Sequence, residues 1–177
     1  MDIDVFDMDD PVLGTARRTV VRAAGSTIIE LYGMSNGIEQ MVSEIRRRAP
    51  LGSIRVLRIW GHGWSGGQMI AAGAHAQTGV DHGSALWASN LRQFGPVLQR
   101  LRPYFQGGAR VELKGCQVAS GAQGENFLVT LAGIFQVDVL AAVDVQGGAW
   151  VAGQHWNGPV VRATPSGGLS SAAWTPL

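Results

Sequence analysis

The stretch "SIRVLRIWGHG", residues 53–63, ends a hydrophobic run with a histidine between two glycines. Its apolar and β-branched residues predict a strand over 54–60 that is buried on both faces, as strands of parallel sheets are. Glycine permits backbone angles that other residues avoid, so Gly61 and Gly63 place His62 on an open, sharply turned loop. The pattern indicates either a turn with an incidental histidine or a loop where another group approaches the imidazole closely.

The sequence on either side of this stretch alternates between strand and helix character. Apolar residues at helical spacing predict three helices, and β-branched runs predict further strands. The expected helices lie near 37–48, 86–103 and 123–135, and the expected strands near 17–24, 54–60, 109–114 and 137–143. This alternation predicts an α/β fold, a three-layer α/β/α sandwich whose mainly parallel central sheet carries helices on both faces.

The composition indicates one globular domain without a strong charge bias. With 177 residues, of which 46% are hydrophobic and 15% charged, the chain is long enough to bury a sizeable core. We expect a flexible acidic arm over 1–14, a single domain over 15–165 and a flexible tail over 166–177. The formal net charge of +1 argues against nucleic acid or an anionic membrane surface as the main partner.

Cys116 is the only cysteine, which excludes an intramolecular disulfide. The N-terminal residues lack the basic segment of a standard secretory signal. No apolar run reaches the roughly 18 residues that a membrane-spanning helix needs. We therefore expect a cytoplasmic protein, and secretion by a non-standard route stays open.

Cys116 directly follows the strand predicted over 109–114, much as His62 follows the earlier one. Ligands of parallel sheets gather at the carboxyl ends of the strands, so both side chains should lie at one edge of the sheet. A thiolate attacks carbonyl carbon whereas a thiol does not, so a catalytic cysteine needs a neighbouring base or cation, which an imidazole supplies near neutral pH. Backbone N–H groups at Gly63, Gly115 and Cys116 are candidates for holding the oxyanion of a tetrahedral intermediate.

Two segments resemble the caspase-like clan of cysteine peptidases, which includes caspases, gingipains, separase and toxin self-processing domains. They are "RIWGHGWSGGQMIAAG" (58–73) and "VELKGCQVASGAQGENFLVTLAGIFQVDVLAAVDVQGG" (111–148). The resemblance extends to an uncharacterised bacterial branch, found in very large surface or repeat proteins, with the pattern "SHG…GG…LG" followed by "YGC.VA.G..G..F…LA..TGADVAAS". It implies that His62 is the catalytic base and Cys116 the nucleophile, on a caspase-like α/β/α sandwich.

Three further residues are candidates for contact with a substrate at the same edge. Asp144 follows the strand predicted over 137–143, so its carboxylate either pairs with a basic substrate side chain or caps a turn. Gly147 would let a substrate backbone approach closely, and Trp64 is a candidate for lining a cleft. No second cysteine or spaced set of acidic residues completes a metal site, so neither a metal nor a cofactor is expected.

These features predict a cysteine endopeptidase of the caspase-like type, a hydrolase that cleaves a protein or peptide substrate in cis or in trans. His62 and Cys116 form its catalytic dyad. The alternative is a binding or assembly module that keeps the fold without turnover and engages a partner protein or a second copy of the chain. A third interpretation places an acyltransferase or small-amide hydrolase on the same dyad.

Overall fold

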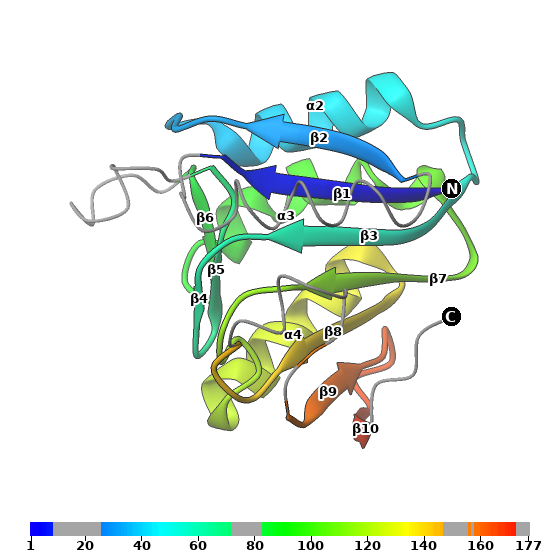
Figure 1. The fold of residues 1–177 in the computed structure, drawn as a ribbon. Helices are drawn as coiled ribbons and strands as arrows, with labels where there is room; N and C mark the ends of the chain where they lie inside the picture. Colours follow the sequence, from blue (N-terminus) through cyan, green and yellow to red (C-terminus); the bar gives the residue numbers. More distant parts are fainter. Residues whose placement is uncertain (9–25, 72–82, 147–155, 157, 173–177) are drawn as a thin grey trace.

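The computed structural model describes residues 1–8, 26–71, 83–146, 156 and 158–172 (Figure 1). Strands and helices alternate along the chain, and a 3-10 turn over Arg102–Tyr104 leads into the longest strand. The elements are β1 (Asp2–Asp7), β2 (Thr27–Leu31), α2 (Gly37–Arg48), β3 (Ile54–Trp60), β4 (Gly63–Trp64), β5 (Gly67–Met69), β6 (Ala85–Trp87), α3 (Leu91–Gln99), β7 (Phe105–Leu113), α4 (Gly121–Phe135), β8 (Asp138–Ala142), β9 (Val160–Ala163) and β10 (Leu169–Ala172).

Seven strands form one sheet in the order β10-β9-β8-β7-β3-β1-β2 (Figure 1). The five strands from β8 to β2 run parallel, and β9 and β10 join antiparallel at one edge. A second, small antiparallel sheet has the order β4-β5-β6. The expected α/β class with a mainly parallel central sheet is confirmed, and β3 covers the predicted range 54–60.

The hydrophobic core lies between the large sheet and the three described α-helices. Ile3, Leu57 and Val111 come from β1, β3 and β7 and pack with the apolar sides of α2, α3 and α4. In α2, these apolar residues include Ile38 and Met41, which recur at helical spacing. The described helices therefore cover one face of the sheet and lie behind it in Figure 1. These residues show two layers of the expected three, and the strand expected near 17–24 lies outside the described residues.

The acidic N-terminus corrects one expectation, because its first residues are not a flexible arm. Asp2–Asp7 forms β1, which is buried along its length and inserted between β2 and β3. Strand alternation sends Ile3 and Val5 into the core, while Asp2 and Asp4 face the opposite side of the sheet. This strand could not be predicted from its acidic composition, because the arginines that pair with its carboxylates come from β3, more than fifty residues away.

The C-terminal segment 166–177, also expected to be flexible, contains the edge strand β10. Leu169–Ala172 pairs antiparallel with β9. The turn between the two strands uses Gly167 at φ +87°, and the hydroxyl of Thr164 accepts the N–H of Gly168 at 3.0 Å. The glycine-rich composition serves a hairpin here.

The helix expected over 86–103 is shorter than predicted. Ala85–Trp87 pairs with β5 as β6, and α3 begins only at Leu91. Asn90 fixes the turn between them, because its side chain accepts the N–H of Trp87 at 3.0 Å and donates to the carbonyl of Ala85 at 2.9 Å. A single polar side chain thus separates strand from helix within a segment of continuous apolar periodicity.

Candidate functional site

The carboxyl ends of three neighbouring parallel strands meet at one edge of the large sheet. β3 pairs with β7, and β7 pairs with β8, so the loops that follow these strands lie side by side. His62 follows β3, Cys116 follows β7 and Asp144 follows β8. The prediction that His62 and Cys116 follow neighbouring strands of one sheet is confirmed.

The His62 and Cys116 loops touch through their glycines. A Cβ atom on Gly63 would lie 2.9 Å from Gly115 Cα and 2.8 Å from Cys116 O. A Cβ atom on Gly115 would lie 2.8 Å from Gly63 Cα. Side chains do not tolerate such an approach, so glycine on both sides allows the two backbones to meet. His62 and Cys116 therefore flank a direct backbone contact between their loops.

The small sheet β4-β5-β6 is hydrogen-bonded to the His62 loop. The N–H of Met69 on β5 donates to the carbonyl of His62 at 2.8 Å. The turn between β4 and β5 is also attached to the Cys116 loop, since the N–H of Gly66 donates to the carbonyl of Val118 at 3.1 Å. The hairpin thus joins the His62 loop and the Cys116 loop, which are the two motif loops, into one unit.

Gln68, on the central strand of the small sheet, is a site residue that the sequence reasoning missed. Its side chain is fully buried, Oε1 accepts the N–H of Gly115 at 2.9 Å, and Nε2 donates to the carbonyl of Gly61 at 3.1 Å. It therefore bridges the loops of His62 and Cys116. The sequence offers only a lone glutamine among small and apolar residues, which does not reveal its distant partner.

Cys116 is half-buried, and its sulfur lies beside a backbone N–H group. The N–H of Gln146, in the loop after β8, donates to Sγ at 3.3 Å. Gln117 takes a positive φ of 56°, and its N–H donates to the carbonyl of Asp144 at 3.1 Å. These bonds fix the Cys116 loop against the loop after β8. A hydrogen bond donated to sulfur stabilises negative charge there. His62 is exposed.

The two glycines predicted to supply oxyanion donors differ in availability. The N–H of Gly115 donates to Gln68 Oε1, so this group is already used. Because the N–H of Met69 donates to His62 O, Gly63 and Gln68 form a non-hydrogen-bonded pair of the antiparallel hairpin. The N–H of Gly63 therefore points away from β5.

The candidates for substrate contact lie in different environments. Asp144 is exposed, and its carboxylate lies against Gly158, so no desolvation cost demands a cationic partner. Trp64 is half-buried and packs edge-on against Trp87, with ring centroids 5.2 Å apart. Gly147 lies outside the described residues.

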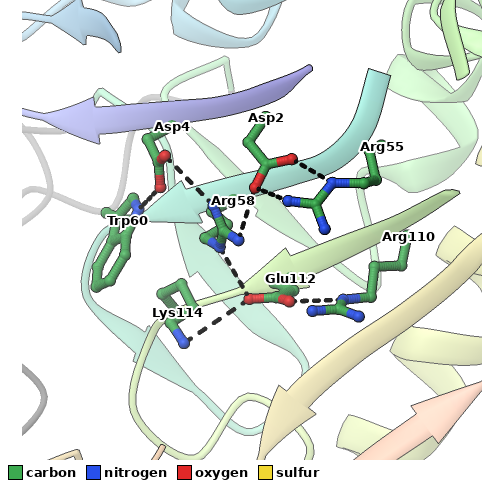
Figure 2. Close-up of polar contacts among 8 residues, drawn as sticks. All are labelled: Asp2, Asp4, Arg55, Arg58, Trp60, Arg110, Glu112 and Lys114. Atoms are coloured by element: carbon green, nitrogen blue, oxygen red, sulfur yellow. Dashed lines mark hydrogen bonds and ion pairs between the residues drawn. The ribbon is translucent and has the colours of Figure 1, made fainter. Parts of the chain in front are cut away.

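A buried ionic cluster occupies the sheet face opposite the helices (Figure 2). Arg58 on β3 contacts Asp2 and Asp4 of β1 and Glu112 of β7 at 3.1, 3.5 and 3.3 Å, and all four residues are buried. Burial raises the pKa of the Asp4 carboxyl, although the charge of Arg58 opposes this shift. In β1 and in the second half of β7 charged residues alternate with apolar ones, which is the sequence signal that places them on one face.

Lys114, the only lysine of the chain, completes this cluster next to Gly115. Its Nζ lies 3.6 Å from the ring centroid of Trp156, 5.3 Å from that of Trp60 and 3.9 Å from Glu112 Oε2. Burial lowers the pKa of Lys114 to about 7, because desolvation of the ammonium outweighs the attraction of Glu112. The amine therefore titrates near neutral pH, two residues before Cys116.

A family model covers most of this chain, including all three loops of the candidate site. The model describes a domain of unknown function, DUF4347, and it matches residues 10–160. The chain belongs to the DUF4347 family. Neither the curated proteins nor the solved structures contain a match to it. In this DUF4347 chain, the matched range holds both motif loops and Gln68, while β1 precedes it and β10 follows it.

Two negative observations apply to the described residues of the DUF4347 chain. In that part of the chain, no three His, Cys, Asp or Glu side chains are grouped as metal ligands would be. The helices described in the structure are all too short or too polar to cross a bilayer.

Proposed function

We propose that this DUF4347 protein is a cysteine peptidase of the caspase-like type, with Cys116 as nucleophile and His62 as general base and acid. The contact of Gly63 with Gly115 carries the proposal, because it sets the two motif loops against each other at one edge of the parallel sheet. We also propose that the full chain adopts the three-layer caspase-like sandwich. The described sheet and its helical face would be two of its layers.

The reaction that we propose follows from these positions. Cys116 Sγ, its proton taken by His62, bonds to the carbonyl carbon of the scissile peptide. The C–N bond then breaks as His62 returns the proton to the leaving amine, and water hydrolyses the resulting thioester. The N–H of Gln146 supports this role by stabilising negative charge on the sulfur before attack.

Backbone donors near the sulfur are the groups that we assign to the oxyanion. The N–H of Gly63 points away from its own hairpin, and Gly63 lies in close contact with the Cys116 loop. Within the described residues, the N–H of Cys116 donates to no acceptor. Of the expected donors at Gly63, Gly115 and Cys116, we assign Gly63 and Cys116 to the oxyanion, since Gln68 already holds the N–H of Gly115.

The substrate we propose is a protein or peptide, cut in cis or in trans. Asp144 ends the neighbouring strand, and its exposed carboxylate is open to a basic substrate side chain. A peptide library profiled with wild type and Asp144→Ala tests this contact. Loss of a preference for Arg or Lys before the cut bond supports it, whereas an unchanged preference leaves Asp144 as a turn residue.

Alkylation of Cys116 tests the dyad itself. Purified protein is treated with iodoacetamide at neutral pH, and labelling is followed by mass spectrometry in wild type and His62→Ala. We expect wild type to react faster than a free thiol and His62→Ala to lose this advantage, with peptide hydrolysis lost in Cys116→Ala. Equal labelling rates in wild type, His62→Ala and a free thiol would rule the dyad out.

One contact favours the alternative of a binding or assembly module. Cys116 Sγ also lies 3.9 Å from the carbonyl of Gln146, so a neutral thiol can donate to the same residue whose N–H it accepts. A sulfur tied in this way would serve to fasten the loop after β8. In that case Cys116→Ser would keep partner binding, and no peptide would be cleaved by wild type.

A further inference from the structure

The buried side chain of Gln68 holds two peptide groups that lead directly to the proposed catalytic residues. The carbonyl of Gly61, which accepts from Nε2 at 3.1 Å, belongs to the peptide group whose nitrogen is that of His62. The N–H of Gly115, which donates to Oε1 at 2.9 Å, lies one residue before Cys116. The amide of Gln68 therefore fixes the backbone just before His62 and just before Cys116.

The orientation of this amide is set by its surroundings. The Gly115 N–H is a donor, so the atom facing it must be the oxygen of Gln68. The nitrogen end faces carbonyls, with Gly61 O at 3.1 Å, Met69 O at 3.3 Å and Ile59 O at 3.5 Å. A flipped amide would place donor against donor and acceptor against acceptor, so only one orientation fits.

Gln68 is also held rigidly itself. It lies on β5, the central strand of the small sheet, opposite Gly63 on β4 and Leu86 on β6. Its side chain is fully shielded from solvent, so water cannot replace its bonds without opening the hairpin. A group on a central strand, buried and bonded at both ends, has the features of a support for precisely spaced side chains.

We propose that Gln68 is a positioning residue that sets the spacing of the His62 and Cys116 loops. The inference rests on the proposed function, because it concerns the same dyad. The partners of the Gln68 amide are backbone groups. Gln68 acts by holding the Gly61 and Gly115 peptide groups, and it removes the Gly115 N–H from the set of oxyanion donors.

A double-mutant cycle on Cys116 alkylation tests this role. The substitution Gln68→Met keeps a similar side-chain volume and removes the hydrogen bonds to Gly61 and Gly115 together with the others of the amide. Gln99→Met on the exposed side of α3 is the matched control. Iodoacetamide labelling rates are measured with and without His62→Ala in each background, at a temperature where circular dichroism shows all variants folded. Amide hydrogen exchange of Gly115 is followed by NMR in the same samples.

We expect His62 to accelerate labelling in the wild-type and Gln99→Met backgrounds, and this acceleration to fall roughly tenfold or more in Gln68→Met. Gly115 should exchange faster in Gln68→Met. A purely structural role would lower the melting temperature and leave the His62-dependent acceleration unchanged, which would overturn the inference while the dyad stands. No effect of His62→Ala in wild type would instead overturn the proposed function, and with it the role of Gln68.

Discussion

Gly63 lies where any side chain would collide with the Cys116 loop. An added Cβ would lie 2.6 Å from Val118 Cγ2 and 2.8 Å from Cys116 O, the second of which is backbone and cannot rotate away. Gly63→Ala should therefore lower the free energy of unfolding by about 1–3 kcal/mol, the usual cost of overpacking. Urea unfolding followed by circular dichroism measures this loss.

Gly107 provides the control for that substitution. It lies on the exposed part of β7, and a Cβ there would have no atom within 4 Å. Gly107→Ala should leave the urea midpoint nearly unchanged. Equal midpoints for Gly63→Ala and Gly107→Ala would show that the two motif loops do not meet as the structure places them.

The buried Lys114 should make the free energy of unfolding depend on pH between about 7 and 10.5. Its pKa is lowered from 10.5 to about 7, so between these values the unfolded chain holds a proton that the folded chain does not. Raising the pH through this window therefore favours the folded state, and below pH 7 the full cost of burying the ammonium is present. The free energy of unfolding of wild type should rise relative to Lys114→Met, by up to roughly 1.4 kcal/mol per pH unit.

Because Lys114 is the only lysine, its titration can also be observed directly. Lysine-selective isotope labelling gives one side-chain NMR signal to follow with pH in the folded protein. A midpoint near that of an exposed lysine, together with parallel stability curves for wild type and Lys114→Met, would contradict the burial of this amine.

At the scale of elements, Arg58 ties three parallel strands together on their polar face (Figure 2). Arg58→Met would leave the carboxylates of Asp2, Asp4 and Glu112 with less compensation in a buried site. Removing one partner of a buried ion pair typically costs about 3–5 kcal/mol, so chemical denaturation should show a loss of this size in the free energy of unfolding.

Arg162 provides the control. Its side chain is 49% exposed and pairs with Asp138, so Arg162→Met should lower the free energy of unfolding by under about 1 kcal/mol. Similar losses for both variants would contradict the cluster.

At the scale of the whole molecule, the N-terminal strand completes the large sheet. β1 pairs with β3 on one side and β2 on the other, so deleting residues 1–8 would remove an interior strand and part of the core. We expect the deletion to abolish the cooperative transition in calorimetry. Leu51→Ala, at a side chain 71% exposed, should keep that transition. An unchanged melting temperature after the deletion would contradict the interior position of β1 and support the flexible arm that was predicted from composition.

Local patterns along the chain are enough to predict the class of fold and the edge of the sheet where the candidate site lies. Hydrophobic runs and helical periodicity are local signals, so β3, α2 and α4 lie close to their expected ranges. The glycines beside His62 and Cys116 marked the two loops, because backbone approach needs a missing side chain. Placing both loops at one edge required only the rule that parallel strands end together.

Features that depend on partners distant in the chain became visible only in the folded protein. Gln68 shows its role only when Gly115, forty-seven residues away, comes within 2.9 Å. The carboxylates of Asp2 and Asp4 resembled a solvated arm until Arg58 was placed beside them. Polar side chains in a sequence do not reveal whether water or a distant residue will satisfy them, because burial is a property of the assembled sheet.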